Sequence, residues 1–430
     1  MFNQCFRYLN IPKSLTYIGN KCYPNNINNS IRMISSITKD ISYIDKIYEY
    51  SSQSDHKTSL NDLVNLKTYK EEDKINYVHN ALKIKIAKKL VEIETFPNGL
   101  SQMESIKKVE GWYMQSFKDL ITIDNNLGGI SLINKQSYSK TLQDIYDRHS
   151  STMITMSKGI FEWKQMIENK YRIGNNGDNV AFFRQTHNRL ISPVEIALTK
   201  FYQGRISIRL LLEHYLELSK GEHNTENNKQ SDIFTSQQYV GIINMKCKPI
   251  NIIKEVYMDI VYMTEREYGS SPALNINNFP IDHKYLDELN FDITIPYVSS
   301  NLYYALFEVL KNSARAIMES QRKNINLSPI KIVIPEIVVP GSTYIIKISD
   351  HGDGIHFNDL DNIWSFFYTT SKKNIYTLNN TDQFDDFGKN APIAGFGHGL
   401  PISRLYLRYF GGDLRINSIK DNGTDVYLYI

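Results

Sequence analysis

The chain has 430 residues, of which 41% are hydrophobic, and this length predicts two or three globular domains of ordinary size. Its net charge is only +3 and its Lys and Arg residues form no dense cluster, which argues against a nucleic-acid partner. No stretch approaches the ~18 to 20 consecutive apolar residues of a membrane-spanning helix. We therefore expect a protein that is soluble or only peripherally bound to a membrane.

Residues 1–39 have the composition of a mitochondrial targeting segment. They carry scattered Arg and Lys residues, many Ser and Asn residues, and no Asp or Glu before Asp40. An acid-free amphipathic leader of this kind is typical of a mitochondrial transit peptide. The alternative is a disordered basic arm that binds nucleic acid, but its charges are spread more thinly than backbone phosphates favour.

The chain from about residue 41 to 218 has the apolar spacing of amphipathic helices, three or four residues apart. This spacing predicts helices within 81–93, 106–121, 141–167 and 193–218. Long helices with polar connections favour an antiparallel four-helix bundle. The segment 220–232 is polar and poor in core residues, so we assign 40–232 to a helical domain and 233–430 to a second domain.

The second domain alternates helical and β-rich segments, which predicts an α/β sandwich. Two strand pairs are predicted, 330–339 with 343–349 and 413–419 with 425–430. Pro340-Gly341 and Asp421-Asn422-Gly423 supply the two turns. Between the pairs, residues 371–394 are long, polar and aperiodic, which is typical of a mobile loop that covers a site.

A glycine-rich run leads into a helix near the end of the chain. From Gly395 to Leu400 it reads Gly-Phe-Gly-His-Gly-Leu, and Pro401 suits the first turn of the helix that follows. Such a backbone can approach an anion closely, and a helix start aims unpaired N–H groups at it. The run indicates a phosphate-binding loop, although a short glycine-rich loop by itself is more often a mobile turn.

The predicted helix over residues 301–319 carries an unusual polar face. Glu308, Asn312, Arg315 and Glu319 follow at spacings of four, three and four residues, which places them on one side of the helix. The simplest interpretation is a solvated face. The order of the motifs favours a site instead, because Asp350-His-Gly-Asp-Gly, Thr369-Thr370, the glycine-rich run and Gly423-Thr424 follow in turn.

These motifs resemble the N, G1, G2 and G3 boxes of the GHKL ATPase superfamily. The boxes are Glu308-x-x-Lys-Asn-x-x-Arg, Asp350-x-Gly-x-Gly, Gly395-x-Gly-x-Gly and Gly423-Thr. Residues 310–316 and 395–406, and Asp147-Arg-His in the helical domain, resemble the mitochondrial 2-oxoacid dehydrogenase kinases from about residue 60 onward. The resemblance implies a four-helix bundle followed by a GHKL (Bergerat) α/β sandwich that binds ATP.

The resemblance also implies a role for each site residue, with ATP and Mg²⁺ as cofactors and K⁺ as a further cation. Asn312 would ligate Mg²⁺, and Asp350 would accept a hydrogen bond from the adenine amino group. Glu308 would be the general base, and His149 would orient it. Phosphate charge and other nucleotide contacts would be held by Lys311, Arg315, Gly352, Gly354, Thr369, Thr370, Gly395, Phe396, Gly397, His398, Gly399, Leu400 and Thr424.

The sequence departs from the family pattern in three places. Ser150-Ser151 replace the Asn/Asp-Asp pair that usually follows the histidine of Asp-Arg-His, and His351 and Asp353 replace the common Arg and Gly of the G1 box. The chain ends at Ile430 inside the last predicted strand, without the long tail that pyruvate dehydrogenase kinases exchange across their dimer. Docking would then use the helical domain alone, or follow the tail-poor branched-chain style.

The resemblance implies a protein-serine kinase of the mitochondrial matrix that phosphorylates and inactivates the E1 component of a 2-oxoacid dehydrogenase complex, with pyruvate E1 preferred. Its partners would be E1, the lipoyl domain of the E2 core and a second copy in a homodimer. The alternatives are a branched-chain kinase, a histidine kinase that autophosphorylates His149, and a catalytically silent ATP-binding scaffold.

Overall fold

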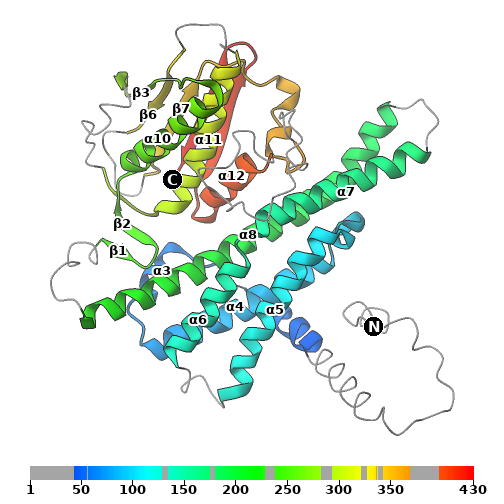
Figure 1. The fold of residues 1–430 in the computed structure, drawn as a ribbon, viewed down its shortest axis with the longest axis vertical. Helices are drawn as coiled ribbons and strands as arrows, with labels where there is room; N and C mark the ends of the chain where they lie inside the picture. Colours follow the sequence, from blue (N-terminus) through cyan, green and yellow to red (C-terminus); the bar gives the residue numbers. More distant parts are fainter. Residues whose placement is uncertain are drawn as a thin grey trace.

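The structure is a computed structural model with a helical region and an α/β region (Figure 1). It describes residues 43–55, 57–127, 134–174, 180–227, 238–281, 293–320, 327–335, 337, 342–368 and 397–430. The predicted transit peptide and the predicted loop at 371–394 lie outside these residues. The domain boundary near residue 232 also lies outside them and stays a prediction. Among the described helices, none is long and apolar enough to span a membrane.

The helical region is built from long helices joined by short connections. They are α3 (Leu60–Leu66), α4 (Glu71–Glu94), η3 (Pro97–Gln102), α5 (Glu104–Leu127), α6 (Lys135–Arg148), α7 (Thr152–Gly174) and α8 (Val180–Asn227). Ser59 begins α3 with a capping box, because its hydroxyl accepts from the Asp62 amide at 3.1 Å and its amide donates to the Asp62 carboxylate at 2.8 Å. Three of the four predicted helical segments, 81–93, 106–121 and 193–218, each lie within one of these helices.

The helix predicted over 141–167 is interrupted, and this part of the prediction is wrong. Helix α6 ends at Arg148 and α7 begins at Thr152. His149 lies at the break with its ring buried, stacked on Tyr113 at 4.2 Å between centroids and 3.0 Å from the Ser116 hydroxyl. These contacts with α5 hold the chain in a turn that the apolar spacing of the sequence does not reveal.

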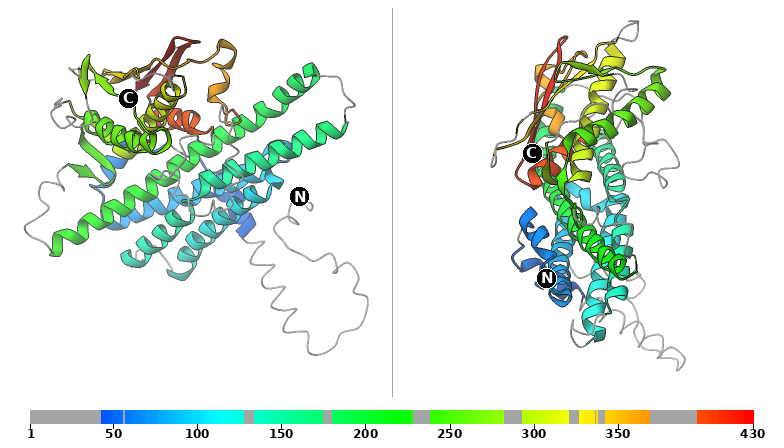
Figure 2. Two further views of the ribbon diagram at one scale, coloured as in Figure 1. Left: turned by 45° about the horizontal axis from the view of Figure 1, so that its top comes forward. Right: turned by 90° about the vertical axis from the view of Figure 1, so that its left-hand side faces the viewer.

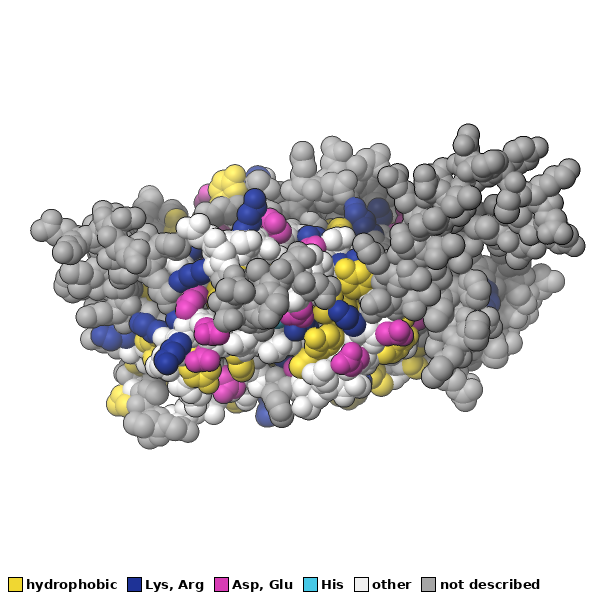
Figure 3. Space-filling model, turned by 90° about the horizontal axis from the view of Figure 1, so that it is seen from below, with side chains coloured by type: hydrophobic (Ala, Val, Ile, Leu, Met, Phe, Trp, Pro, Cys, Tyr) yellow, Lys and Arg dark blue, Asp and Glu magenta, His cyan; other side chains and the backbone are white. Residues whose placement is uncertain are grey.

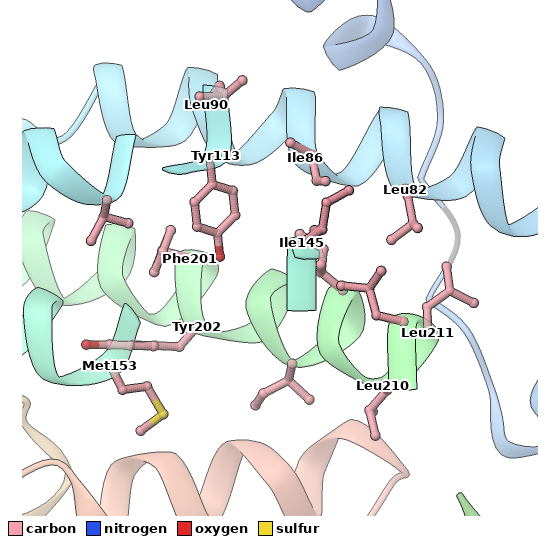
Figure 4. Packing of buried hydrophobic residues seen from close by; sticks show 14 of the residues in the cluster. Leu82, Ile86, Leu90, Tyr113, Ile145, Met153, Phe201, Tyr202, Leu210 and Leu211 are labelled. Atoms are coloured by element: carbon pink, nitrogen blue, oxygen red, sulfur yellow. The ribbon is translucent and has the colours of Figure 1, made fainter. Parts of the chain in front are cut away.

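One hydrophobic core runs through the helical region and continues into the α/β region. In Figure 4, Leu82 and Ile86 of α4 point toward the side where Leu211 of α8 lies, and all three are buried. The same cluster includes Ile402, Leu405, Tyr406 and Tyr409 of α12 (Gly399–Tyr409). Since apolar burial dominates packing free energy, α12 is held by the helical region as well as by its own sheet.

The α/β region contains a six-stranded mixed sheet in the order β4-β3-β6-β7-β9-β8. Its strands are β3 (Leu274–Ile276), β4 (Phe279–Ile281), β6 (Ile330–Val333), β7 (Ile345–Asp350), β8 (Asp413–Ile419) and β9 (Gly423–Tyr429). Only the β3–β6 pair is parallel, and the other pairs are antiparallel. Helices α10 (Pro249–Tyr268), α11 (Ser299–Ser320) and α12 lie on one side of the sheet (Figures 1 and 2).

The predicted strand pairs are present with shifted ends. Strand β8 has the predicted bounds, and β9 begins two residues earlier than predicted because Asp421 and Gly423 both have positive φ angles, 64° and 102°, that close a tight turn. Strand β6 ends at Val333, and its predicted turn at 340–341 lies outside the described residues. The smaller sheet β1-β2-β5 was not predicted; its strands are β1 (Tyr239–Val240), β2 (Ile243–Cys247) and β5 (Ile295–Val298).

The described surface mixes the two signs of charge. The face in Figure 3 shows Lys and Arg side chains interspersed with Asp and Glu side chains and with apolar groups. Among the ion pairs of the described residues, Asp413 at the start of β8 is contacted by Arg404 at 2.9 Å and by Arg408 at 2.7 Å. These guanidinium groups hold the pKa of Asp413 well below its usual range, against the opposing effect of partial burial.

The helical core should be sensitive to the loss of a single side chain. Leu82 is fully buried, so Leu82→Ala should lower the free energy of unfolding by about 2–5 kcal/mol. Ile196 is 63% exposed on α8, and Ile196→Ala should change it by less than about 0.5 kcal/mol. Urea denaturation followed by circular dichroism measures both. Equal losses of unfolding free energy in the two variants would contradict the burial of Leu82 in this core.

Stability should fall as the pH falls through the range of histidine titration. Burial lowers the pKa of His149 to about 3 and those of His214 and His398 to about 4, whereas an unfolded histidine has a pKa of about 6.5. The unfolded chain therefore binds more protons below pH 6.5. Each histidine should lower the free energy of unfolding by up to about 1.4 kcal/mol for each pH unit that the pH falls between 6.5 and its folded-state pKa. Urea unfolding at several pH values measures how the free energy of unfolding changes with pH. His214→Phe should reduce this dependence. A free energy of unfolding that stays constant from pH 7 to 5 would contradict the prediction.

Candidate active site

Ten of the predicted site residues line one cavity of about 360 Å³ in the α/β region. Its walls come from α11, from the end of β7 and the loop after it, from the start of α12, and from β9. The predicted residues that line it are Glu308, Lys311, Asn312, Arg315, Asp350, Gly354, Gly397, Gly399, Leu400 and Thr424. The polar face of the 301–319 helix is therefore the wall of a cavity, and the interpretation as a solvated face is wrong.

Glu308 and Lys311 form a buried ion pair on the α11 wall. The Lys311 Nζ donates to Glu308 Oε1 at 2.6 Å, and the two residues are only 6% and 8% exposed. A buried carboxylate is stable only when it is paired or hydrogen bonded, and the i, i+3 spacing supplies the partner from the same helix. The remaining oxygen, Oε2, faces the start of α12, because a Cβ atom added to Gly399 would lie 1.9 Å from it.

Asp350 is held in one orientation at the end of β7. Its Oδ1 accepts from the Gly352 amide at 3.0 Å, and its Oδ2 accepts from the Ser313 hydroxyl at 2.9 Å. Burial raises the pKa of Asp350, and these hydrogen bonds oppose that rise. Sequence reasoning missed Ser313. The only signal for it was its position directly after Asn312, on the side of α11 that turns toward the sheet.

Gly354 allows the G1 loop to turn beside the cavity. It has a φ of 64°, and an added Cβ atom would lie 2.1 Å from the carbonyl oxygen of Ile419. No other residue type fits such a conformation and contact without strain. The loop after β7 therefore packs closely against the β8–β9 turn, and Thr424 lies directly across from Asp350 in the β7–β9 ladder.

Seven predicted residues do not line the cavity or lie outside the described residues. Gly352 acts behind the wall, where its amide donates to Asp350. Thr369, Thr370, Gly395 and Phe396 lie outside the described residues. The His398 ring is buried and contacts Ser157 and Phe366 instead of lining the cavity. His149 lies in the helical region, where the described contacts of its ring are with Tyr113 and Ser116, so its action on Glu308 stays a prediction.

The donor set of the cavity suits a cation that is held mainly by phosphate and water. Among the described residues, no group of three or more His, Cys, Asp or Glu side chains could hold a metal ion. The Asn312 amide lines the cavity one turn after Glu308. Mg²⁺ in nucleotide sites keeps several waters and takes few protein ligands, so one amide oxygen fits the expected MgATP.

Gly399→Ala should disturb this site through a steric clash. The added Cβ atom would overlap Glu308 Oε2, so we expect a loss of about 1–3 kcal/mol in the free energy of unfolding together with weaker ATP binding. Gly111 in α5 has open space at its Cβ position, and Gly111→Ala should be neutral or stabilising by up to about 1 kcal/mol. Thermal denaturation with and without ATP measures both variants, and an unaltered Gly399→Ala protein would contradict the described contact.

Comparison with known proteins gives matches over both regions. Residues 57–244 match the family model described as mitochondrial branched-chain alpha-ketoacid dehydrogenase kinase, and residues 297–430 match the one described as histidine kinase-, DNA gyrase B-, and HSP90-like ATPase. The mitochondrial pyruvate dehydrogenase (acetyl-transferring) kinase of Arabidopsis thaliana is 30% identical over 358 residues, 82% of this chain and 83% of that relative.

Two animal relatives match this chain with the same identity and similar coverage as the plant protein. Isozyme 4 of the mitochondrial pyruvate dehydrogenase kinase of Homo sapiens is 30% identical and covers 82% of this chain and 75% of its own length. The mitochondrial enzyme of Drosophila melanogaster is 30% identical with coverage of 82% and 76%. Because the similarity runs through the helical region as well as the ATPase region, we conclude that the chain belongs to the family of mitochondrial 2-oxoacid dehydrogenase kinases and is a GHKL-type protein kinase.

Proposed function

We propose that the chain uses MgATP to phosphorylate a serine of the E1 component of the pyruvate dehydrogenase complex in the mitochondrial matrix, and so inactivates it. The observation that carries the proposal is the single cavity shared by the buried Glu308–Lys311 pair, Asn312, Asp350 and the start of α12. Phosphoryl transfer needs positioning and charge stabilisation more than covalent chemistry. One cavity with these groups can supply both.

Two groups of residues on the cavity wall suit the two ends of ATP. Asp350 is fixed by Gly352 and Ser313, so its carboxylate can accept from the adenine amino group without further reorganisation. At the other end, α12 begins at Gly399, and its first amides can bind phosphate oxygens with the help of the helix dipole. The amides of Gly395 to Leu400 would complete this cradle, with Thr369 and Thr370 as further nucleotide contacts.

Between these ends, Asn312 would hold Mg²⁺, which neutralises phosphate charge when bound, and K⁺ is a further candidate cation. Arg315 lines the same wall one turn later. Glu308 would take the proton of a substrate serine hydroxyl. Lys311 occupies its Oε1, which leaves Oε2 facing the expected phosphate end. A general base in this position contributes about 10²- to 10⁴-fold to the rate.

The helical region would serve substrate recruitment. We propose that α4, α5, α8 and the interrupted helix α6–α7 act as a four-helix bundle, spanning residues 40–232, that docks on the lipoyl domain of the E2 core. We also propose a homodimer. The outer face of the six-stranded sheet supports it, because Val333 and Ile345 are exposed there at 50% and 37%, and exposed apolar patches favour association.

A branched-chain 2-oxoacid dehydrogenase kinase is the second candidate. One observation favours it, because the family model that matches residues 57–244 is described by the branched-chain enzyme. The curated relatives at 30% identity are named as pyruvate dehydrogenase kinases, and this supports pyruvate E1 as the first substrate to test.

Glu308→Gln tests the proposal most directly. It keeps the shape of the side chain and its place in the cavity but removes the proton acceptor, so ATP affinity should stay within about twofold while E1 phosphorylation falls at least about 10²-fold. Calorimetry with ATP and transfer of labelled phosphate to E1 measure the two quantities. Glu265→Gln, on the exposed side of α10, is the matched control and should leave both unchanged.

The same assay separates the alternatives when pyruvate E1 and branched-chain E1 are supplied side by side. Label on pyruvate E1 supports the proposal, and label only on branched-chain E1 selects the second candidate. Acid-labile label on the chain itself, at His149, would identify a histidine kinase. ATP binding without transfer to either E1 would identify a scaffold, and full transfer by Glu308→Gln would remove Glu308 as the general base.

A further inference from the structure

The phosphate loop is anchored by a histidine that does not face the cavity. His398 lies between Gly397 and Gly399, both of which line the cavity, and its carbonyl accepts from the Ile402 amide at 3.0 Å to begin α12. Glycines on both sides give this loop wide conformational freedom. The position of the loop therefore depends on the contacts of the His398 side chain.

Both ring nitrogens of His398 have partners in other parts of the chain. Nε2 lies 2.9 Å from the carbonyl oxygen of Phe366, and Nδ1 lies 2.6 Å from the hydroxyl of Ser157 in α7. A carbonyl can only accept, so Nε2 carries the hydrogen and Nδ1 is an acceptor for the Ser157 hydroxyl. The same hydroxyl also lies 2.9 Å from the Met153 carbonyl oxygen of its own helix, so its one hydrogen is shared between a longer contact within α7 and the shorter contact with His398. The ring is only 5% exposed, which keeps competing water away from both hydrogen bonds.

Aromatic side chains from both regions pack around the His398 ring. The His398 ring lies 5.6 Å from the Phe366 ring and 6.3 Å from the Tyr202 ring of α8, measured between centroids. Tyr202 and Phe366 are themselves 5.0 Å apart. The His398 ring thus contacts two helices of the helical region, α7 through Ser157 and α8 through Tyr202. Figure 1 shows α7 and α8 coming close to α12 in this part of the molecule.

We propose that His398 is a positioning residue that sets the phosphate-binding loop through its hydrogen bond with Ser157, so that the helical region controls ATP affinity. This inference rests only on the ATP-binding part of the proposed function. When α7 and the loop keep this geometry, the amides at the start of α12 face the phosphates. When α7 shifts, the loop loses its anchor and ATP binds more weakly. By reciprocity, bound ATP stabilises this arrangement of α7.

A double-mutant cycle on the full-length chain tests the proposal without E1. Ser157→Ala and His398→Phe should each weaken ATP binding about fivefold, the effect expected for one buried hydrogen bond, and the double variant should be no weaker than His398→Phe alone. Ser157→Thr keeps the hydroxyl and should retain the affinity. Calorimetric titration with MgATP supplies each value.

The matched control is Thr264→Val in α10. The Thr264 hydroxyl is buried but bonds only within its own helix, to Ile260 at 2.8 Å and Val261 at 3.1 Å. This variant should lose stability like Ser157→Ala while its ATP affinity stays unchanged. Hydrogen exchange adds a second measurement, because ATP should protect the amides of α7 near Ser157 in the natural chain and not in Ser157→Ala.

The outcomes separate this inference from the proposed function. Non-additive affinities with ATP protection of α7 support the inference even where no E1 is phosphorylated. Normal ATP affinity in Ser157→Ala and His398→Phe, or equal losses in Thr264→Val, would overturn it even where E1 is phosphorylated. If Ser157→Ala fails to fold, Ser157→Cys, with a weaker donor at the same position, takes its place and should show an intermediate affinity.

Discussion

The organisation of the site depends on the cost of burying two carboxylates. Glu308 and Asp350 are 8% and 5% exposed, and a buried charge must be paired or hydrogen bonded. Lys311 of the same helix forms an ion pair with Glu308. Asp350 instead accepts hydrogen bonds from Ser313 of α11 and from the Gly352 amide in the loop after β7. These bonds tie α11 to the end of β7. The space left between them is where the nucleotide is proposed to bind.

The second constraint is the continuity of the core. Helix α12 presents Leu407 to the sheet cluster, and Ile402 and Leu405 to the helical cluster. A helix that is packed on both sides cannot move without disturbing both regions. This makes the start of α12 a natural place for the helical region to influence ATP binding, and the His398 contacts lie at that start.

Much of the site was predictable because its residues are close in sequence. The spacing of Glu308, Asn312 and Arg315 follows the helical period, and α11 brings all three to one wall as predicted. The last hairpin was predictable from Asp421 and Gly423, whose backbone requirements are local. Strand β1 was missed because it has only two residues, and β5 was missed because it is short and pairs with β2, which lies far before it in the sequence.

The order of the ATP-site motifs, the polar face of α11 and the resemblance to the family can all be read from the sequence. The contacts between residues far apart in the chain cannot be read from it, because they depend on the tertiary structure. Ser157 and His398 are 241 positions apart and Ser313 and Asp350 are 37 apart, and no periodicity links either pair. Such pairings arise from the packing of whole helices and sheets, in which each buried polar group must find a partner.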